Sequence, residues 1–578
     1  MDTKWKRYTS IILFSALSTS VIAAETTKNK AKDIDEFSNI SKSKRRSLAP
    51  HFFQKSIKDI SIKEYPLASI HDAKLDEQGN PTDKSQINKM QILNNGLAAL
   101  QKRIELIEKA QEEILLEYFI FEPKEYSTQL ILKKLIEKAE NGVKVKILLD
   151  KSFSVFAFDE LYVQAILTHL GIKQKTRAQR RKITSNFEVR YYNANPFWGV
   201  STMNFRNHRK LLAIDGNKEA ITGGRNIEDK YFDLDRSYNF HDRDIWVSGP
   251  VVKTMTDSFH MFWNHDIVQK YQWPKSVKKF KIFDDKEATV KRNKKYNKWL
   301  KEEVLNSKRV DKLYEDLKII GNENLEKTEV RECMKTTFVT DRPGGNFWKR
   351  MDVYGSNDLI NLWGGDEDFK EKYIITERAL GEFIYKANEK ITIISPYFLL
   401  NQRASAVKDY LLKNKIQVNV FTNSLNSTDA FYVASRFYSD AFAWSDSGLK
   451  IYVHGSKFIE NEMGVTDDKV KEATWGLHSK TQVYDDDKFY VGTYNVDNRS
   501  AFYNTEMGLF CEGNKELVSD ILEDVDNKSR VHGLVITGKN SAEDVNGNSV
   551  DIYAGAEKDE VKKIKFLEGV LQPFEFLM

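Results

Sequence analysis

Apolar positions along the chain alternate between a helical spacing and short continuous runs. From about Lys89, apolar residues recur every three or four positions and predict a helix, which leads to the apolar run 114–121. A second helical segment around Leu130 leads to the apolar run 143–149. Continuous apolar runs between helices are typical of strands buried on both faces. The alternation therefore predicts parallel strand pairing in an α/β layered fold.

The same order of elements recurs in the second half of the chain. A predicted helix over 376–388 leads to a strand over 391–400, and a helix over 404–413 leads to a strand over 416–421. This second set lies about 270 residues beyond the first, and recurrence at a constant offset indicates an internal duplication. We expect an α/β fold of two duplicated sheet-plus-helix lobes related by a pseudo-twofold axis.

The first residues have the pattern of an export signal. Lys4, Lys6 and Arg7 precede an apolar run over 11–24 that ends in small residues. Because this run is shorter than the roughly 20 residues of a membrane-spanning helix, a cleaved signal peptide is favoured over an uncleaved anchor. We expect an exported protein, periplasmic or secreted, that is peripheral to a membrane.

The patterns divide the whole chain into five expected segments. The stretch after the signal is polar and Lys/Ser-rich without periodicity, and a second Lys-rich stretch separates the two repeats. The expected segments are a signal peptide (1–24), a flexible N-terminal arm (25–88), a first lobe (89–267), a Lys-rich linker or insertion (268–345) and a second lobe (346–578).

The Lys-rich linker carries interleaved aromatic residues and has two interpretations. Trp273, Phe280, Phe283 and Trp299 stand among its lysines. The simpler interpretation is a solvated helical connector. The alternative is a membrane-surface contact, since basic and aromatic side chains together bind anionic lipid headgroups.

Composition and charge narrow the class of protein. The 578 residues are 41% hydrophobic and 30% charged, which is the composition of a folded chain with enough core for two lobes. Lys+Arg 89 against Asp+Glu 84 gives a net charge of only +5, so a surface built to bind nucleic acid is not expected. Cys333 and Cys511 are too few for a disulfide scaffold or a zinc cluster, and two buried thiols are favoured over a single bridge. His260 and His265 are five apart, which does not place two metal ligands on one helical face, so we expect no metal and no cofactor.

Each repeat ends in the same polar signature, H-x-K-x-x-x-x-D. Its members are His208, Lys210 and Asp215 in the first copy and His478, Lys480 and Asp485 in the second. Residues two apart in a strand share a face, so each histidine projects beside its lysine. If the two copies meet across the pseudo-twofold axis, two imidazoles and two ammonium groups surround one anion.

This arrangement suits a phosphodiester. One histidine attacks phosphorus to form a phosphohistidine, the other protonates the leaving oxygen, and the lysines neutralise the phosphoryl oxygens. Each imidazole needs an acceptor on its second nitrogen to fix the tautomer, and the motif aspartates are available for that role. The alternative for Asp215, which precedes Gly216, and for Asp485 is a turn role only.

A similar tail follows each motif and supplies the expected substrate-binding residues. Glycine backbone can approach a phosphate closely, and asparagine amides can donate to its oxygens. Glu506 is a further member, either to orient a catalytic histidine or to pair with a lysine. The full set is Gly223, Gly224, Asn226, Asn495 and Glu506.

At this point the sequence resembles the phospholipase D superfamily, whose signature is the duplicated H-x-K-x-x-x-x-D motif, and within it the bacterial cardiolipin synthases of the C type. The likeness runs from about residue 90 to the C-terminus and thins out in the Lys-rich middle. The segments that carry it are NPF (195–197), NHRKLLAIDG, ITGGRNIEDKYF, RDIWVSGPVV, ISPYF (394–398), TNSLNSTD (422–429), HSKTQVYDDDKFYVGTYNVDNRS, NTEMGL and the ending LQPFEFLM.

The resemblance implies a bilobed fold with one shared active site and a two-step reaction through a phosphatidyl-histidine. It implies that His208 is the nucleophile and His478 the general acid. It also implies crossed orientation, with Asp485 holding His208 and Asp215 holding His478. The lysines of both motifs, with Asn226 and Asn495, carry over as phosphate ligands.

Two acceptors remain open for the expected reaction on a phospholipid at a membrane surface. The favoured function is a phosphatidyltransferase that condenses two phosphatidylglycerols into cardiolipin and glycerol. The alternative is a secreted phospholipase D that hydrolyses phospholipids to phosphatidic acid, since acceptor choice depends on how the site excludes water. A nuclease is disfavoured by the near-neutral charge, and a non-enzymatic lipid-binding protein is disfavoured because both motifs are intact.

Overall fold

The computed structural model of the protein describes about two thirds of the chain. The described residues are 68–74, 76–77, 81–151, 160–171, 186–193, 206–270, 294–343, 375–458, 464–526, 533–538, 541–553, 559 and 561–562. The expected signal peptide (1–24) lies outside these residues, as do most of the expected N-terminal arm and the Lys-rich stretch 271–293 with Trp273, Phe280 and Phe283. None of the described helices is both long and apolar enough to cross a bilayer.

The first lobe is built on a mixed sheet, which has nine strands among the described residues, in the order β10-β5-β4-β3-β6-β7-β9-β2-β11. Strands β3, β4 and β5 pair in parallel, as the alternation of helix and strand predicts, and the remaining pairs are antiparallel. The strands are β2 (Asn88–Leu93), β3 (Glu113–Tyr118), β4 (Lys144–Asp150), β5 (Phe187–Tyr192), β6 (Leu211–Ile214), β7 (Glu219–Gly223), β9 (Asp244–Ser248), β10 (Val268–Lys270) and β11 (Arg331–Cys333).

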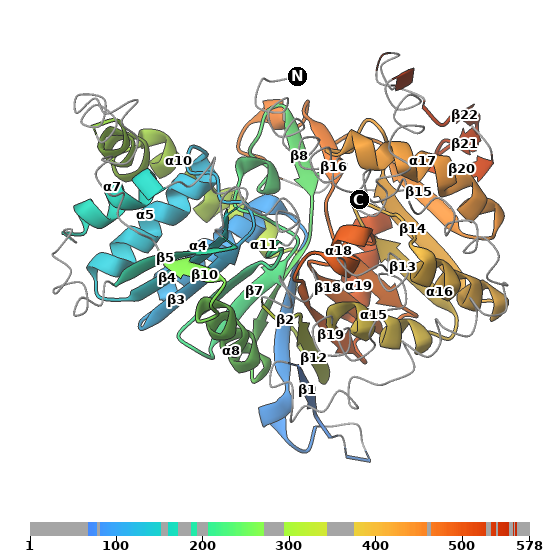
Figure 1. The fold of residues 1–578 in the computed structure, drawn as a ribbon, viewed down its shortest axis with the longest axis horizontal. Helices are drawn as coiled ribbons and strands as arrows, with labels where there is room; N and C mark the ends of the chain where they lie inside the picture. Colours follow the sequence, from blue (N-terminus) through green and yellow to red (C-terminus); the bar gives the residue numbers. More distant parts are fainter. Residues whose placement is uncertain are drawn as a thin grey trace, which may run out of the picture.

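Helices cover the sheet of the first lobe with their apolar faces (Figure 1). They are α4 (Gly96–Lys109), α5 (Tyr126–Glu140), α7 (Glu160–His169) and α8 (Val251–Trp263). The start of α4 is fixed by Asn95, whose side chain accepts a hydrogen bond of 2.9 Å from the backbone N–H of Ala98. Regular spacing of Leu and Ile then buries one face of this helix against the sheet.

The second lobe repeats this plan in the other half of the molecule (Figure 1), which confirms the predicted duplication. The described residues of its sheet have the order β1-β12-β19-β18-β17-β13-β14-β15-β20-β21-β22, with β13, β14 and β15 parallel. The strands of this sheet are β1 (Ser69–Asp72), β12 (Lys335–Thr340), β13 (Lys390–Ile394), β14 (Gln417–Asn423), β15 (Lys450–His454), β17 (Thr481–Tyr484), β18 (Lys488–Gly492), β19 (Met507–Glu512), β20 (Leu534–Gly538), β21 (Ser541–Glu543) and β22 (Ser549–Asp551). The helices are α15 (Ile375–Tyr385), α16 (Gln402–Lys413), α17 (Phe431–Asp446), α18 (Asn498–Phe502) and α19 (Lys515–Val525).

The expected linker (268–345) is not a linker over its described part. Trp299 is 5% exposed, donates to the carbonyl of Pro123 at 3.1 Å and packs its ring on Tyr162, so it belongs to the core of the first lobe and does not face a membrane. The surface-contact interpretation is therefore wrong for this tryptophan. Helical segments that pack on the same core follow it, namely η5 (Leu300–Leu305), α10 (Lys308–Asp316), η6 (Leu317–Gly321) and α11 (Asn322–Leu325).

One chain segment then passes from one sheet to the other. Strand β11 pairs with β2 in the first lobe, and after a single residue β12 (Lys335–Thr340) pairs with β19 in the second lobe. Strand β1 (Ser69–Asp72), which lies within the expected arm 25–88, pairs with β12 at the edge of the second sheet. The expected segment boundaries near 88 and 345 are therefore wrong, because both segments contribute strands to the sheets.

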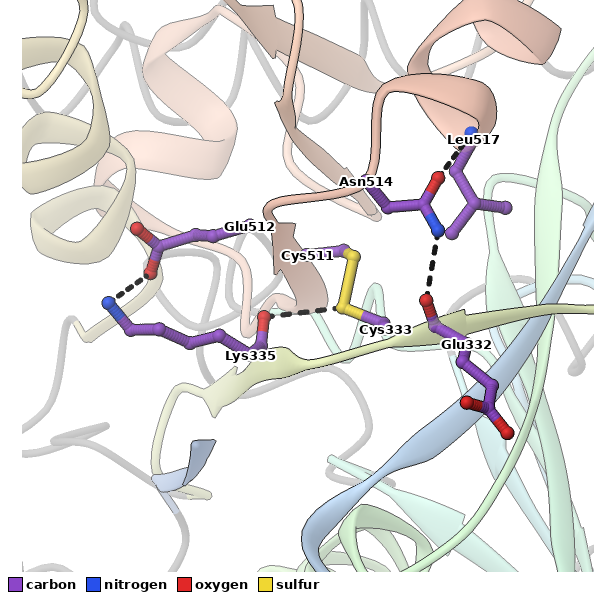
Figure 2. The surroundings of a disulfide bond; sticks show 7 residues. All are labelled: Glu332, Cys333, Lys335, Cys511, Glu512, Asn514 and Leu517. Atoms are coloured by element: carbon purple, nitrogen blue, oxygen red, sulfur yellow. Dashed lines mark hydrogen bonds and ion pairs between the residues drawn. A yellow bond between two sulfur atoms is a disulfide. The ribbon is translucent and has the colours of Figure 1, made fainter. Parts of the chain in front are cut away.

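A disulfide between Cys333 and Cys511 closes this crossing (Figure 2). Cys333 ends β11 of the first sheet, and Cys511 lies in β19 of the second, so the bond ties the two lobes covalently. Our expectation of two buried thiols is wrong. The sequence places the two cysteines 178 residues apart and gives no sign that the crossing strand brings them together.

Candidate active site

The two motif histidines are held where the lobes meet. His208 and His478 each lie in extended chain just before β6 and β17, and they are 6% and 4% exposed. The backbone N–H of His208 donates to the carbonyl of Thr505 at 3.1 Å, and that of His478 donates to the carbonyl of His241 at 2.8 Å. Each motif therefore enters the site on a hydrogen bond to the opposite lobe.

Short parallel pairings support both contacts. Strand β16 (Thr474–Leu477), which ends one residue before His478, pairs with β8 (Tyr238–His241) of the first lobe, and an isolated bridge joins Asn207 to Thr505. The two arrangements are equivalent under the pseudo-twofold axis that the duplication predicts.

A carboxylate from the opposite lobe orients each imidazole. The Nδ1 atom of His208 lies 3.0 Å from Oε2 of Glu506, and the Nδ1 atom of His478 lies 2.7 Å from Oδ2 of Asp242. Asp242 directly follows His241 and Glu506 directly follows Thr505, so each carboxylate follows the carbonyl that binds its histidine's backbone. A donor at Nδ1 leaves the lone pair on Nε2, which is the nitrogen for attack on phosphorus.

The motif aspartates do not orient the histidines, and the pairing that the resemblance implies is wrong in its residues. Asp215 accepts backbone N–H groups of residues 111–113 at 2.8–3.2 Å, and Asp485 accepts those of residues 388–390 at 2.9–3.2 Å. Both have positive φ, +50° and +58°, in the hairpins that follow β6 and β17. The turn interpretation is confirmed, and each aspartate fixes the start of the neighbouring strand. As expected, each histidine is oriented by a carboxylate of the opposite lobe, but the two carboxylates are those of Glu506 and Asp242.

The paired glycines make room for two carboxylates. A Cβ atom on Gly224 would lie 2.0 Å from Oδ1 of Asp242, and one on Gly223 would lie 2.4 Å from Oδ1 of Asp244. Gly223 also has a φ of +152°, which favours glycine. Gly224 therefore leaves the space that Asp242 occupies, and contact of either glycine with phosphate stays a prediction.

The two motif lysines lie fully buried beside the histidines. The ammonium of Lys210 donates to the carbonyl of His208 at 2.8 Å, and that of Lys480 lies 3.0 Å from Nε2 of His478. Burial and the charge of Lys480 lower the pKa of Lys210 to about 7, and burial lowers the pKa of Lys480 to about 8. Two such cations in one desolvated site form a binding place for an anion.

Burial and nearby charge also set the state of the acids and bases. Burial and both lysines lower the pKa of His208 well below its usual value, and burial with Lys480 lowers that of His478 to about 4. Burial raises the pKa of Glu506 to about 7. Burial would also raise the pKa of Asp242, but His478, Lys480 and Arg225 outweigh it and hold this pKa below its usual range. Both imidazoles are therefore neutral at pH 7 in this state.

The asparagines of the two tails have different surroundings. The side-chain oxygen of Asn226 accepts from the backbone N–H of Ile120 at 3.2 Å, and its amide nitrogen donates to the Tyr231 hydroxyl at 3.0 Å. The backbone N–H of Asn495 donates to Ser500 at 3.1 Å, while its side-chain oxygen is buried without a hydrogen bond among the described residues. The contact of both side chains with phosphate stays a prediction.

Our sequence reasoning missed Asp242 as a functional residue. Its position gives a usable signal, because Asp242 shortly precedes β9 as Glu506 directly precedes β19, and those strands are equivalent in the two sheets. Aligning the two repeats beyond their motifs would have found it. No cluster of His, Cys, Asp and Glu within the described ranges is arranged to hold a metal ion.

Comparison with known proteins defines the family. Residues 103–263 and 380–528 match the family described as "Cardiolipin synthase, PLD-like domain". The two matched ranges coincide with the two lobes and make up more than half of the chain. The protein belongs to this family.

Individual relatives are distant. The chain is 28% identical over 444 residues to an "Uncharacterized protein" of Helicobacter pylori, covering 76% of this chain and 78% of that one. It is 24% identical over 436 residues to "Cardiolipin synthase C" of Escherichia coli, covering 73% and 80%. The crystal structure of phosphatidylserine synthase from Haemophilus influenzae superposes with a TM-score of 0.51 at 14% identity over 90% of this chain and 99% of that one, which shows a shared fold.

Proposed function

We propose that the protein is a phosphatidyltransferase that works through a covalent histidine intermediate and condenses two phosphatidylglycerols into cardiolipin and glycerol. The observation that carries the proposal is the shared site, in which each lobe supplies a histidine and the opposite lobe supplies the carboxylate that orients it. The match to the cardiolipin synthase family and the relative named "Cardiolipin synthase C" support the substrate class.

In the first step, the phosphodiester of one lipid lies between Lys210 and Lys480. The Nε2 atom of His208 attacks phosphorus while the bond to the glycerol oxygen breaks, and Glu506 stabilises the positive charge that grows on the imidazole. His478 gives its Nε2 proton to the leaving oxygen. Although burial lowers its pKa to about 4, a bound phosphate anion and Asp242 both favour the charged form.

In the second step, the hydroxyl of an acceptor takes the phosphatidyl group from His208. The neutral His478 accepts the proton of that hydroxyl, the new oxygen–phosphorus bond forms, and the nitrogen–phosphorus bond breaks. The two histidines thus return to their starting states. A water molecule can follow the same path, and the product is then phosphatidic acid.

The disulfide supports the proposal that the protein acts outside the cytoplasm. Disulfides persist in oxidising compartments and are rare in the cytosol. The Cys333–Cys511 bond and the signal-like residues 1–24 therefore point to the same location, at the outer side of a membrane whose phospholipid is the substrate.

Product analysis tests this function. Purified protein is incubated with phosphatidylglycerol vesicles, with and without added glycerol, and the lipids are measured by mass spectrometry. The proposal predicts cardiolipin, in an amount that excess glycerol lowers, and no product from the His208→Ala variant. Phosphatidic acid as the sole lipid product would identify a hydrolytic phospholipase D instead.

A further inference from the structure

Two polar residues of the second lobe lie at the same sheet edge as the second motif. Tyr397 follows β13 and Asp429 follows β14, and the carboxyl ends of parallel strands meet at one edge of a sheet, where ligands commonly bind. Ile394 at the end of β13 pairs with Thr481 at the start of β17, directly after Lys480. Both polar residues come from segments that the sequence resemblance singles out, ISPYF and TNSLNSTD, and the two reaction steps above give them no role.

Hydrogen bonds hold the end of β14 beside the strand that leads to His478, and they join Tyr397 to Asp429. Asn423 at the end of β14 accepts from the backbone N–H of Leu477 at 2.7 Å and donates to its carbonyl at 2.8 Å. The hydroxyl of Tyr397 donates to Oδ1 of Asp429 at 2.7 Å. Both side chains are only partly buried, so they stand at the border between the closed site and solvent.

The charge of Asp429 reaches the catalytic groups. Its carboxylate acts to raise the pKa values of His478 and Lys480, and it contributes to the raised pKa of Lys230. The ammonium of Lys230 lies 5.5 Å from the centre of the Phe240 ring, and that ring lies 4.8 Å from the ring of His478. The Asp429 carboxylate therefore acts on the charge of His478, Lys480 and Lys230.

At the position of Tyr397, the described part of the first lobe has an apolar residue. Phe121 and Phe398 make equivalent parallel bridges, to Ile227 and Val496, so Ile120 is the counterpart of Tyr397. The ring beside His208 is that of Phe119, with ring centres 5.2 Å apart. The pseudo-twofold axis is thus broken at this position, with Ile120 in the first lobe and Tyr397 in the second.

We propose that Asp429 and Tyr397 form the subsite for the acceptor, and that they bind the further hydroxyl groups of a polyhydroxy alcohol such as the glycerol headgroup of a second lipid. The inference rests on the proposed function. The reacting hydroxyl gives its proton to Nε2 of His478, its oxygen bonds to phosphorus, and the bond from phosphorus to His208 breaks. Carboxylate and phenol groups hold the remaining hydroxyls, which a monohydric alcohol or water lacks.

A competition between two alcohols tests the subsite. Phosphatidylglycerol vesicles are incubated with the full-length protein and equal concentrations of carbon-13-labelled glycerol and ethanol. Mass spectrometry measures labelled phosphatidylglycerol, phosphatidylethanol and phosphatidic acid. The readout is the ratio of labelled phosphatidylglycerol to phosphatidylethanol, which a general loss of activity does not change.

Three variants are compared. Asp429→Asn should lower the ratio roughly tenfold or more, because it removes a charge-assisted hydrogen bond to the acceptor. Tyr397→Phe removes one hydroxyl only and should lower the ratio by roughly threefold to tenfold. Asp446→Asn, an exposed change at the end of α17, should leave the ratio and the total product unchanged.

The outcomes separate the subsite from the proposed function. If both site variants keep the wild-type ratio, the subsite is overturned, whether or not the total product falls. The proposal of phosphatidyl transfer then still stands. A wild-type protein that releases only phosphatidic acid in the presence of both alcohols would overturn transfer and subsite together.

Discussion

The Glu506→Gln variant tests which residue orients His208. In the structure it is Glu506, whereas the sequence resemblance implies Asp485. Glu506 is fully buried and its carboxylate accepts from Nδ1 of His208, whereas Asp485 accepts only from a turn and a strand start. Removing a hydrogen bond to a charged group costs about 1.5–3 kcal/mol, which is about 10- to 100-fold in rate. A glutamine that presents its amide nitrogen to Nδ1 would also invert the tautomer, and loss of tautomer control costs up to about 10⁴-fold.

The matched control is Asp485→Asn. This variant removes charge from a turn that holds residues 388–390, so we expect a loss of about 1–3 kcal/mol in the free energy of unfolding and turnover within about threefold of wild type. The assay is the rate of phosphatidylglycerol consumption in vesicles at pH 7, with urea unfolding of each variant. The reasoning would be refuted if folded Glu506→Gln kept wild-type turnover while Asp485→Asn lost it.

Three further predictions follow from buried groups. The pKa values of Lys210 and Lys480 are lowered to about 7 and 8. We therefore expect kcat/KM to fall as the pH rises through 7–9, because the lysines lose the charge that binds phosphate. A kcat/KM profile that is flat to pH 10 would contradict this. Replacing both Cys333 and Cys511 by Ser should lower the free energy of unfolding by up to about 5 kcal/mol, since the bond closes a loop of 178 residues, and an unchanged urea midpoint would argue against the clamp. Trp299→Ala should cost about 3–5 kcal/mol in urea unfolding, and a loss of vesicle binding without loss of stability would restore the membrane interpretation.

Local pattern was enough to predict the two lobes and the two histidine–lysine pairs. The apolar runs that become β3, β4, β13 and β14 are long and regular, and parallel strands with helical crossovers follow from them. A duplicated motif of polar residues in such a frame implies a shared site, which the structure brings together.

Long-range pairing explains what the sequence could not predict. Asp242 meets His478 across the lobes at a sequence separation of 236 residues, and only its equivalence to Glu506 in an alignment of the two repeats could have pointed to it. The motif aspartates have the right chemistry for the role but stand at turns, where positive φ and several backbone donors fix them. The segment around Cys333 forms two short strands, which pair with strands near opposite ends of the chain. A local pattern therefore could not predict these pairings.

The central claim is that His208 carries the phosphatidyl group between two lobes that act as one site. Its most direct test is a single-turnover reaction of the His478→Ala variant with a lipid p-nitrophenyl phosphodiester, whose leaving group needs no acid. The reaction is stopped in denaturant at alkaline pH, since a phosphorus–nitrogen bond is acid-labile, and the modified peptide is located by mass spectrometry. The account predicts one equivalent of p-nitrophenol and a covalent lipid adduct on His208. An adduct on His478 in the His208→Ala variant, or full turnover by either variant, would contradict it.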